Sequence, residues 1–406
     1  MKIGMVSKFA EEEDGIGIYA TSLCEELENA GISVVKIGDK TASGYARCVE
    51  TTKVVSTSTT ANCTVDFKSF SLKSQLQQIV EKENLDLLHI QYIATYFGKY
   101  TFNLNLLLAL KQKVPVVVTF HEVHTETSSI REKVLSFLQK IIAGKADSVI
   151  AHTKQQKEFL QMKYRKKEAY LVHMGLTPHQ MHKLRGKNVL FFGMLNYGKG
   201  VEYLIRAMNE LTDFKLTVAG KAISEGYEKL LRQAAAENKL GNVKLDIRWV
   251  PEDVKARYLN EADIMAFPYV WAPYQSAAMH NAFSYGIPVV VTDAGAIGEV
   301  VKEFRCGRIV EQRSPKALTA GIRGVLGSYD IYQHGVGRYR EEATWEKTAQ
   351  RHGEIYNETL QEYYEKHGMP EHKKAQEEME EAARDEAEIF DESKANNEND
   401  QDYDKS

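Results

Sequence analysis

The chain has 406 residues, 43% of them hydrophobic and 27% charged, which is the composition of a soluble globular protein. This length exceeds what one hydrophobic core usually supports, so we expect two domains. The net charge of −4 combines an acidic end with a mildly basic body: from Gly368 onward there are fourteen Asp and Glu against five Lys and Arg, so residues 1–367 carry about +5. No cluster of basic and aromatic residues indicates a nucleic-acid partner.

The cysteines argue for a reducing compartment. Cys24, Cys48, Cys63 and Cys306 share no CxxC spacing and are too few for a disulfide framework, so we expect buried free thiols. The first residues, MKIGMVSKF, lack the long apolar core of a signal peptide, and no segment reaches 18 apolar residues. We therefore expect a cytoplasmic protein whose contact with a membrane, if any, is peripheral.

Short apolar runs alternate with helical periodicity from the first residue onward. In the first half, strands are expected at 2–7, 32–38, 85–91, 114–121, 147–152 and 169–175, and helices at 15–31, 72–83, 102–112, 128–144 and 154–162. The Thr- and Ser-rich residues 51–65 are typical of an edge strand or a loop. Nearly continuous apolar strands separated by helices indicate a parallel sheet covered on both faces.

The same pattern restarts after a polar linker at 176–187. Strands are expected at 188–193, 214–220, 243–250, 262–269 and 306–310, and helices at 201–210, 226–238, 252–260, 315–326 and 343–366. Two successive doubly wound halves place a cleft between the carboxyl ends of two sheets, where such folds bind ligands.

Two glycine turns stand at strand–helix junctions, one in each half. The first contains Gly15 and Gly17, and the second contains Gly193, Gly198 and Gly200. Glycine lets a ligand approach the backbone, and the helix N-terminus that follows offers N–H groups to an anion, although each turn taken alone is more often plain turn chemistry. Neither turn is a GxGxxG followed by a ribose-binding acid, which disfavours a nicotinamide dehydrogenase.

Lys199 lies in the second glycine turn, on the predicted cleft side. It is either a solvated surface lysine or a clamp for a diphosphate, because an ammonium group beside free helix amides stabilises such a leaving group. The turn is not a GxxxxGK[ST] loop, which argues against an ATPase. The globular body contains no DxD, which argues against the usual metal-dependent nucleotide-sugar site.

Five histidines lie at the ends of predicted strands of the first half: His89, His121, His124, His152 and His173. A single histidine in such a place is usually structural, but five at the carboxyl ends of parallel strands are expected to face one cleft. No HExxH or other metal spacing is present, so we expect no zinc.

These segments, taken in order, resemble the retaining two-domain glycosyltransferases of family 4, also called glycosyl transferases group 1. The resemblance covers about residues 1–366 and is carried by DGIGIYATSLCEEL, LDLLHIQY, VVVTFHEVH, ADSVIAHT, LVHMG, FFGMLNYGKGVEYLIRA, LNEADIMAFPY, GIPVVVTDAGAIGEVV and ATWEKTA. Each piece is short, and their order and spacing carry the match.

The resemblance implies an α/β GT-B fold, in which two Rossmann-like doubly wound domains face each other across a cleft. The implied parts are an acceptor-side domain at 1–180, a nucleotide-sugar-binding domain at 187–340, and a helix at 341–367 that crosses back onto the first domain. The remaining segment, 368–406, is acidic with only isolated apolar residues and is expected to be disordered.

The resemblance also implies a metal-independent enzyme with no cofactor, whose co-substrate is a nucleotide-diphospho-sugar. His121 matches the cleft histidine of the family and Lys199 its diphosphate lysine, so both are expected to be catalytic. The residues expected to bind the donor are Gly15, Gly17, Gly193, Lys199, Ser276, Ala277, Asn281 and Glu299. Glu299 is alternatively a residue at the start of a helix, behind the residues that touch the donor.

Two departures from the family pattern concern the donor. An Arg usually stands five or three residues before the lysine, where this chain has Met194 and Asn196. The family also has two glutamates eight positions apart ahead of GIPVV, and here Pro273 and Asn281 take those places within a segment, 264–292, that has no charged residue. The resemblance implies that the leaving diphosphate itself helps to remove the acceptor proton. Donor binding then depends on Asn281, Ser276 and the amides of a helix expected after Ser276, together with Lys199.

Three functions remain open. The first is a glycosyltransferase with an altered donor site and a glycan, lipid-linked or small-molecule acceptor. The second is a transferase-like protein that binds a nucleotide sugar or a partner without turnover, and the third is a sugar-nucleotide epimerase of the same fold. The joint presence of His121, Lys199 and both glycine turns favours the enzyme.

Helix 131–145 carries one apolar face with two lysines beside it: Val134, Phe137, Leu138 and Ile141, with Lys133 and Lys140. Packing on the sheet is one interpretation of this face. The other is a helix on an anionic membrane surface that serves a lipid acceptor.

Overall fold

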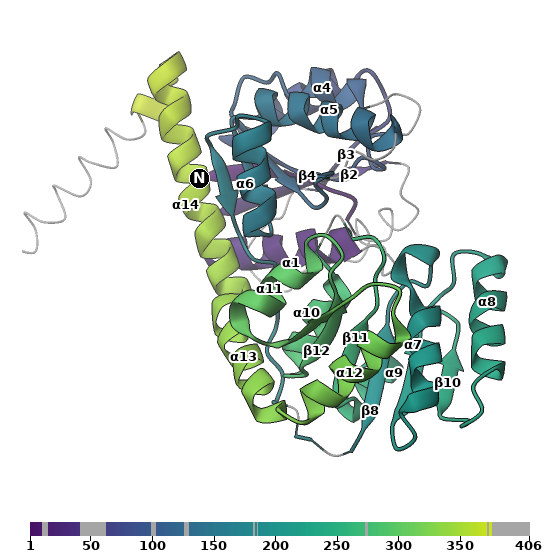
Figure 1. The fold of residues 1–406 in the computed structure, drawn as a ribbon. Coiled ribbons are helices and arrows are strands. Elements are labelled where there is room, and N and C mark those ends of the chain that lie inside the picture. The colour runs from purple at the N-terminus through teal and green to yellow at the C-terminus, as the bar shows by residue number, and fades with distance from the viewer. Residues whose placement is uncertain are drawn as a thin grey trace, which may run out of the picture. The chain divides into compact units, whose positions relative to one another are not determined.

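The computed structural model describes residues 1–9, 15–40, 62–98, 103–125, 130–181, 183–184, 186–272, 275–371 and 373–375, with Asn62 and Cys63 described by their backbone alone. The chain divides into two compact units, residues 1–357 and 358–406. The first unit contains two sheets (Figure 1). Disorder was expected over 368–406; within that segment, residues 371 and 373–375 are helical, and residues 372 and 376–406 lie outside the described residues.

The first half forms a parallel sheet that has seven strands among the described residues, in the order β3-β2-β1-β4-β5-β6-β7. The strands are β1 (Lys2–Val6), β2 (Ser33–Asp39), β3 (Asn62–Val65), β4 (Leu87–Tyr92), β5 (Val116–Phe120), β6 (Ser148–Ala151) and β7 (Ala169–Leu171). The helices are α1 (Gly15–Asn29), α3 (Leu72–Glu83), α4 (Leu104–Ala109), α5 (Ile130–Lys145) and α6 (Lys154–Lys163). Every residue of β4, β5 and β6 is buried, as expected for a parallel sheet covered on both faces.

The second half forms a parallel sheet of six described strands in the order β10-β9-β8-β11-β12-β13. The strands are β8 (Asn188–Phe192), β9 (Lys215–Ala219), β10 (Val243–Asp246), β11 (Ile264–Phe267), β12 (Val289–Thr292) and β13 (Gly307–Val310). The helices are η1 (Tyr197–Lys199), α7 (Val201–Ala207), η2 (Met208–Glu210), α8 (Glu225–Ala236), α9 (Glu252–Glu261), α10 (Ala277–Ser284), α11 (Ile297–Phe304), α12 (Pro315–Leu326) and α13 (Tyr329–Glu342). Both sheets have the strand order of a doubly wound fold, which confirms the two predicted Rossmann-like halves.

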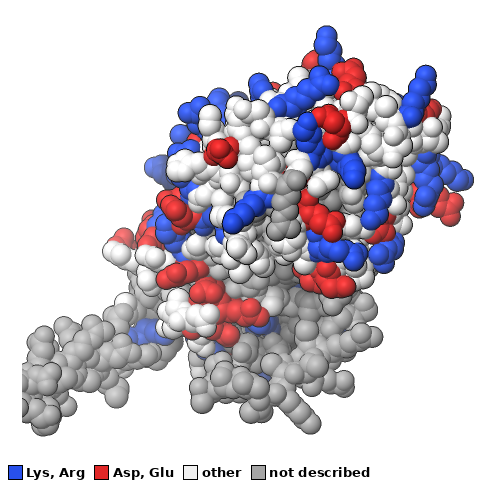
Figure 2. All heavy atoms as spheres, turned by 90° about the horizontal axis from the view of Figure 1, so that it is seen from below, with Lys and Arg blue, Asp and Glu red and all other residues white. Residues whose placement is uncertain are grey.

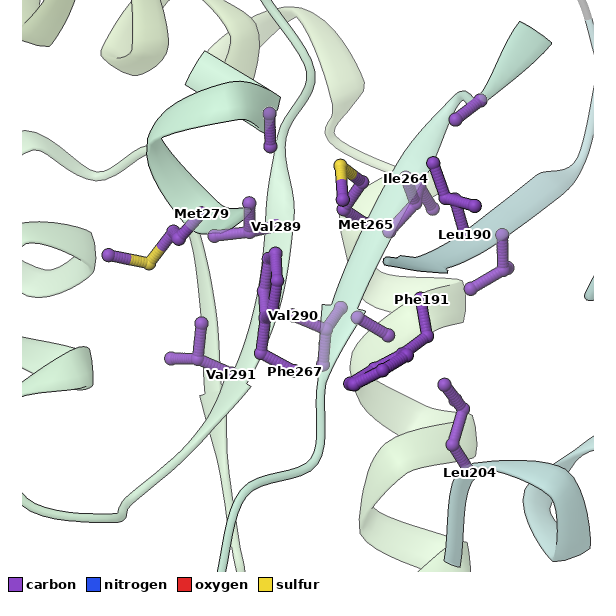
Figure 3. Close-up of a cluster of buried hydrophobic side chains, with 14 of the residues drawn as sticks. Leu190, Phe191, Leu204, Ile264, Met265, Phe267, Met279, Val289, Val290 and Val291 are labelled. Carbon is purple, nitrogen blue, oxygen red and sulfur yellow. The ribbon is translucent and has the colours of Figure 1, made fainter. Parts of the chain in front are cut away.

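The core of the second half surrounds its central strands. Phe191 of β8, Phe267 of β11 and Val290 of β12 are fully buried. Leu204 of α7 and Met279 of α10 pack into the same cluster, as Figure 3 shows. Most of the charge-free segment 264–292 is therefore interior, because β11, β12 and one side of α10 lie within this core.

The last helix, α14 (Trp345–His367), begins in the first unit and there packs against the first half. The ring of Trp345 lies 5.4 Å from that of Tyr19 on α1, and the Tyr356 hydroxyl lies 2.7 Å from Nδ1 of His89 on β4. Gly175 lies under the Trp345 ring, where a Cβ would come within 2.2 Å of a ring carbon. The predicted helix that crosses back onto the first half is confirmed.

Two helices of the second half were not predicted. Residues 329–342 form α13 although they contain Gly335 and Gly337, which weaken helical propensity. Gly335 has a packing reason, because a Cβ there would lie 2.3 Å from the carbonyl oxygen of Arg305. The other helix, α11, has eight residues and follows β12 after a short turn.

The expectation that the face of α5 with Val134, Phe137, Leu138 and Ile141 packs on the sheet is partly wrong. Leu138 and Ile142 are buried, whereas Val134 and Phe137 are 39% and 62% exposed. The buried row thus follows the i, i+4 spacing of Leu138 and Ile142 and leaves the adjacent row of apolar side chains on the surface.

The described cysteine side chains, Cys24 and Cys306, are buried free thiols, while Cys48 and the side chain of Cys63 lie outside the described residues. Within the described ranges, no helix is long and apolar enough to cross a membrane. On the face shown in Figure 2, basic and acidic side chains are interspersed rather than gathered into one basic patch.

Candidate functional site

A cavity of about 570 Å³ opens within the first unit and is lined by residues of both halves. The lining residues follow the carboxyl ends of strands: Ile93 follows β4, His121 follows β5, Gly193 follows β8, Gly220 follows β9 and Tyr269 follows β11. This is the place where doubly wound folds bind ligands, so the predicted cleft is present as a cavity.

The cavity brings together most of the predicted site residues. Those that line it are Gly15, His121, Gly193, Lys199, Ser276, Ala277 and Asn281. Two predicted donor-binding residues do not line it, Gly17 and Glu299. Gly17 is buried in the first turn of α1, where its carbonyl accepts a hydrogen bond from the Thr21 hydroxyl.

The assignment of Glu299 to the donor is corrected by its contacts. Its carboxylate accepts hydrogen bonds from the backbone N–H groups of Lys154 and Gln155, in the first turn of α6. A carboxylate in that position complements the positive end of a helix dipole. Glu299 therefore connects α11 of the second half to α6 of the first.

Two helix N-termini meet at the cavity. α1 begins at Gly15 and α10 at Ala277, and a Cβ built on Gly15 would lie 3.9 Å from the Cβ of Ala277. The Ser276 hydroxyl caps α10 by accepting a hydrogen bond from the Met279 N–H and lies 2.9 Å from the Tyr269 hydroxyl. The positive ends of two helix dipoles beside one cavity favour an anionic ligand.

Close backbone approach shapes one edge of the cavity. Gly193 and Gly220 both have positive φ, 141° and 146°. A Cβ on Gly220 would lie 1.9 Å from the carbonyl oxygen of Gly193, so the ends of β8 and β9 can approach this closely only without side chains.

Lys199 is a buried cation at this site. It ends η1, its side chain is 9% exposed, and its ammonium nitrogen lies 3.7 Å from the centre of the Tyr269 ring. Burial raises the pKa of Tyr269, so this phenol stays neutral near pH 7. The contact is a cation–π interaction between the Lys199 ammonium and the neutral ring.

Two further lysines that line the cavity were missed from the sequence, Lys221 after β9 and Lys255 on α9. The Lys255 ammonium forms an ion pair with Glu252 at 3.0 Å. With Lys199, the second half thus contributes three cations and one carboxylate to the lining. The signal that could have found Lys221 is its place directly after the strand-end glycine, Gly220.

His121 faces the cavity from the first half, but both of its ring nitrogens contact protein groups. Its Nε2 lies 2.7 Å from the Gln91 side-chain amide, and its Nδ1 lies 3.3 Å from Nε2 of His152. Nδ1 of His152 lies 2.9 Å from the Val172 carbonyl oxygen, which can only accept, so His152 carries its proton on Nδ1.

Burial keeps both rings of the pair uncharged. Burial and the neighbouring His152 hold the pKa of His121 well below its usual range, and burial lowers the pKa of His152 to about 4. Both rings are therefore neutral at pH 7. The Gln91 amide directs its Oε1 to Nε2 of His121 and its NH₂ to Met5 and His89, so Nε2 of His121 donates the bond to Gln91.

The expectation that five histidines face one cleft is wrong, since only His121 of the five lines the large cavity. His89 lies inside β4, where its ring bonds to Tyr356 and Thr119. His152 is buried behind His121, and His173 packs against Phe304 and Tyr339. His124 lines a different, smaller cavity. A strand-end position alone does not determine which way a side chain points.

Glu122 adds a carboxylate to the lining of the large cavity and was not predicted from the sequence. Its side chain is 14% exposed, and its Oε1 accepts a hydrogen bond of 3.1 Å from the Ala94 N–H. The only sequence signal was its place directly after His121. No group of three or more His, Cys, Asp and Glu within the described part of the chain could hold a metal ion.

The comparisons with known proteins agree with this geometry. The family model described as Glycosyltransferase Family 4 matches residues 14–180, and the model described as Glycosyl transferases group 1 matches residues 186–328. An uncharacterised glycosyltransferase of Methanocaldococcus jannaschii is 29% identical over 178 residues, which cover 42% of this chain and 44% of that protein. A glycogen synthase of Thermus thermophilus is 27% identical over 205 residues, or 49% of this chain and 43% of the synthase. The matched regions thus span less than half the length of these relatives.

Solved structures show the same fold. The sucrose-phosphate synthase of Thermosynechococcus elongatus superimposes with a TM-score of 0.69 at 19% identity, over 88% of this chain and 98% of that structure. The Anabaena protein HepE, solved in complex with UDP-glucose, superimposes with a TM-score of 0.67 at 15% identity, over 88% and 100%. The predicted GT-B fold is confirmed, and the chain belongs to the family 4 glycosyltransferases, the glycosyl transferases group 1.

Proposed function

We propose that this chain is a glycosyltransferase that moves a sugar, with retention of configuration and without a metal, from a nucleotide-diphospho-sugar to an acceptor. One observation carries the proposal: the N-termini of α1 and α10 meet at the large cavity beside the buried Lys199. Helix amides and an ammonium group stabilise a diphosphate both when it binds and when it leaves.

The altered donor site is compatible with turnover. Asn281 lines the cavity at the position where the family has a glutamate, and its amide offers one acceptor and two donors to a ribose hydroxyl. Losing one charge-assisted hydrogen bond costs about 1.5–3 kcal/mol, which lowers affinity roughly ten- to a hundredfold. Such a loss weakens an enzyme without abolishing its activity.

Retention needs no protein nucleophile in this proposal. The bond from the anomeric carbon to the phosphate oxygen breaks, the bond to the acceptor oxygen forms on the same face, and the acceptor proton passes to the leaving phosphate. The protein then has to hold both substrates and stabilise the diphosphate charge. His121, whose ring nitrogens contact Gln91 and His152, would shape the sugar side of the site.

The test is a panel of nucleotide sugars, starting with UDP-glucose because a structural neighbour was solved with it. We expect slow hydrolysis of at least one donor, and Lys199→Ala should reduce it about a hundredfold, the effect of losing one strong contact to the transition state. Lys229→Ala on the exposed face of α8 is the matched control.

Other results would point to the other functions. A donor that raises the melting temperature and is never turned over, whatever the acceptor, would favour a binding protein. Conversion of the donor into its epimer would favour an epimerase. A panel in which no donor binds would contradict all three.

We also propose that the protein is cytoplasmic and that the outer face of α4 and α5 contacts an anionic membrane surface. Leu108, Ile130 and Phe137 are 53%, 82% and 62% exposed on these two helices, which contact each other. The surrounding segment 103–168 contains twelve Lys and Arg against six Asp and Glu. Exposed apolar side chains next to excess positive charge are typical of a helix that lies at a lipid interface.

Sedimentation with vesicles containing anionic lipid tests this contact. We expect binding that weakens in high salt and falls about fivefold in Phe137→Ser, because the apolar area of one aromatic side chain is lost. Ile223→Ser, at an equally exposed apolar residue of the second half, is the control. Equal binding of the two variants would rule out this face.

A further inference from the structure

The second-half side of the large cavity has two ends that differ in chemistry. The strands of that half run in the order β10-β9-β8-β11. At the β11 end, the Lys199 ammonium lies 3.7 Å from the centre of the Tyr269 ring, and the Ser276 hydroxyl caps α10. This cationic end is the place proposed above for the diphosphate. The β10 end has no role in that proposal.

The β10 end of the cavity is lined by aromatic and apolar side chains with one ion pair beside them. Trp249 and Val250 follow β10, Phe192 ends β8, and Glu252 and Lys255 lie in the first turn of α9. Trp249 is 41% exposed, and Phe192 and Val250 add apolar surface to the same lining. Aromatic side chains in such a place bind a flat heterocycle by stacking, whatever its identity.

The distance between the two ends suits a nucleotide. Neighbouring strands of a sheet lie about 4.8 Å apart, so the three steps from β11 to β10 span roughly 14 Å. A nucleoside diphosphate carries its charge at one end and a flat base at the other, with the ribose between them. When its phosphates lie beside Lys199, its base therefore reaches toward the β10 end.

Lys255 brings a hydrogen-bond donor to this end. Its side chain is 20% exposed, and its ammonium lies 6.0 Å from the centre of the Phe192 ring, which lines the cavity. An ammonium group has three donors. Within the described part of the chain its bonds go to the two carboxylate oxygens of Glu252, at 3.0 and 3.2 Å, which engage at most two of them. At least one donor therefore remains for a ligand.

A fixed donor distinguishes two kinds of base. Uracil, guanine and hypoxanthine carry a carbonyl oxygen on the edge of the ring that lies away from the ribose, whereas cytosine and adenine carry an amino group there. The carbonyl oxygen can accept a hydrogen bond from Lys255, while the amino group presents N–H donors of its own to the cation. A site that offers a charged donor disfavours the base that cannot accept from it.

We infer that Lys255 is a specificity-determining residue that selects a donor whose base carries this carbonyl oxygen over a donor whose base carries the amino group. The base lies against the apolar lining at the β10 end, and the Lys255 ammonium donates to its carbonyl oxygen. The inference rests on the proposed function, because it needs a nucleotide-diphospho-sugar as donor. It narrows that donor to bases of the uracil and guanine kind and excludes those of the cytosine and adenine kind.

Two matched pairs of ligands test this selection. UDP and CDP differ by a carbonyl or an amino group on that edge of the ring, and so do the inosine and adenosine diphosphates. Calorimetry measures their binding whether or not any sugar is transferred. We expect the carbonyl member of each pair to bind about tenfold more tightly, and Lys255→Met should bring each ratio below about twofold by weakening the carbonyl members alone. Lys255→Arg, which keeps a charged donor, should retain the preference and guards against a folding defect.

A variant at the other end of the cavity completes the design. Lys199→Ala should weaken all four nucleotides alike, because all four carry the diphosphate. Equal affinities within each pair in the parent, or ratios unchanged in Lys255→Met, would overturn the inference. An equal loss for all four nucleotides in Lys255→Met would also overturn it, because that result places the ammonium on the phosphates. A parent that shows the preference and never turns over a nucleotide sugar would overturn only the transferase function, and one that binds none of the four would overturn both.

Discussion

The two walls of the large cavity face the same space but carry different chemical groups. The wall from the second half presents the Lys199 ammonium and the N-terminus of α10. The wall from the first half presents His121, a neutral ring whose nitrogens both contact protein groups, and Glu122. The lysines of the lining therefore lie on the second-half side, while the first half adds the N-terminus of α1 and the carboxylate of Glu122.

The two walls are also held in place in different ways. The capping bond of Ser276 and the contact of Lys199 with Tyr269 are made within the second half itself. The first wall depends on a helix from the far end of the chain, because a line of close contacts runs from Tyr356 of α14 through His89 and Gln91 to His121. The shape of the first wall should therefore respond to changes in α14, and that of the second should not.

The largest expected effect tests this dependence. In Gly175→Ala, the new Cβ would come within 2.2 Å of the Trp345 ring, so α14 has to move, and we expect the free energy of unfolding to fall by about 3 kcal/mol. Gly144→Ala in α5 meets nothing within 4 Å and should instead stabilise by about 0.5–1 kcal/mol. Urea denaturation of both variants measures the difference, and equal stabilities would show that α14 does not hold the first wall.

The fold could be predicted well because each half repeats one local pattern, in which a short apolar strand is followed by a helix. Apolar runs gave nearly every strand, and α3 and α12 begin and end where expected. α13 was missed because Gly335 and Gly337 weaken the local helical signal, and Gly335 is required by packing against Arg305. The fold could be predicted from periodicity, whereas this helix depends on a contact between residues far apart in the sequence.

The site was predicted less completely, again because several of its contacts join residues that lie far apart in the sequence. Lys199 and Gly15 follow strands, so their place at the cleft could be predicted. The partners of His121 come from β4 and from the end of β6, and no local pattern indicates that its ring nitrogens are engaged. Glu299 resembled a donor residue from its turn, but only the structure shows that it contacts α6.

The second prediction uses pH to act on the first wall. Burial lowers the pKa of His152 to about 4 in the folded protein, while an exposed histidine titrates near 6.5. Below pH 6.5 the unfolded chain therefore binds a proton that the folded chain does not, so stability falls as the pH falls from 6.5 toward 4. For His152 alone the loss at pH 5 is about 2 kcal/mol.

His280 and His352 are buried with pKa values that burial also lowers to about 4, so the whole protein should lose stability steeply in this window. His152→Asn keeps a donor for the Val172 carbonyl and cannot titrate. Thermal unfolding between pH 7.5 and 5 should show a shallower loss in this variant than in the parent. Parallel curves would mean that His152 is not held neutral behind the cavity.

The smallest expected effect concerns position 281 on the second wall, where the family places a glutamate and this chain has Asn281. Asn281→Glu adds a negative charge to the wall that we propose binds the diphosphate, so the sign of the effect on affinity depends on which part of the nucleotide the side chain meets. If position 281 lies beside the ribose, the carboxylate gains a charge-assisted hydrogen bond, and affinity for the nucleotide should rise about tenfold, or about 1.4 kcal/mol. If it lies beside the phosphates, repulsion should lower affinity instead.

Asn281→Gln controls for size without charge, and calorimetry with the free nucleoside diphosphate measures all three proteins. We expect tighter binding, because Lys199 and the start of α10 already occupy the phosphate side and Asn281 lies one turn further along the helix.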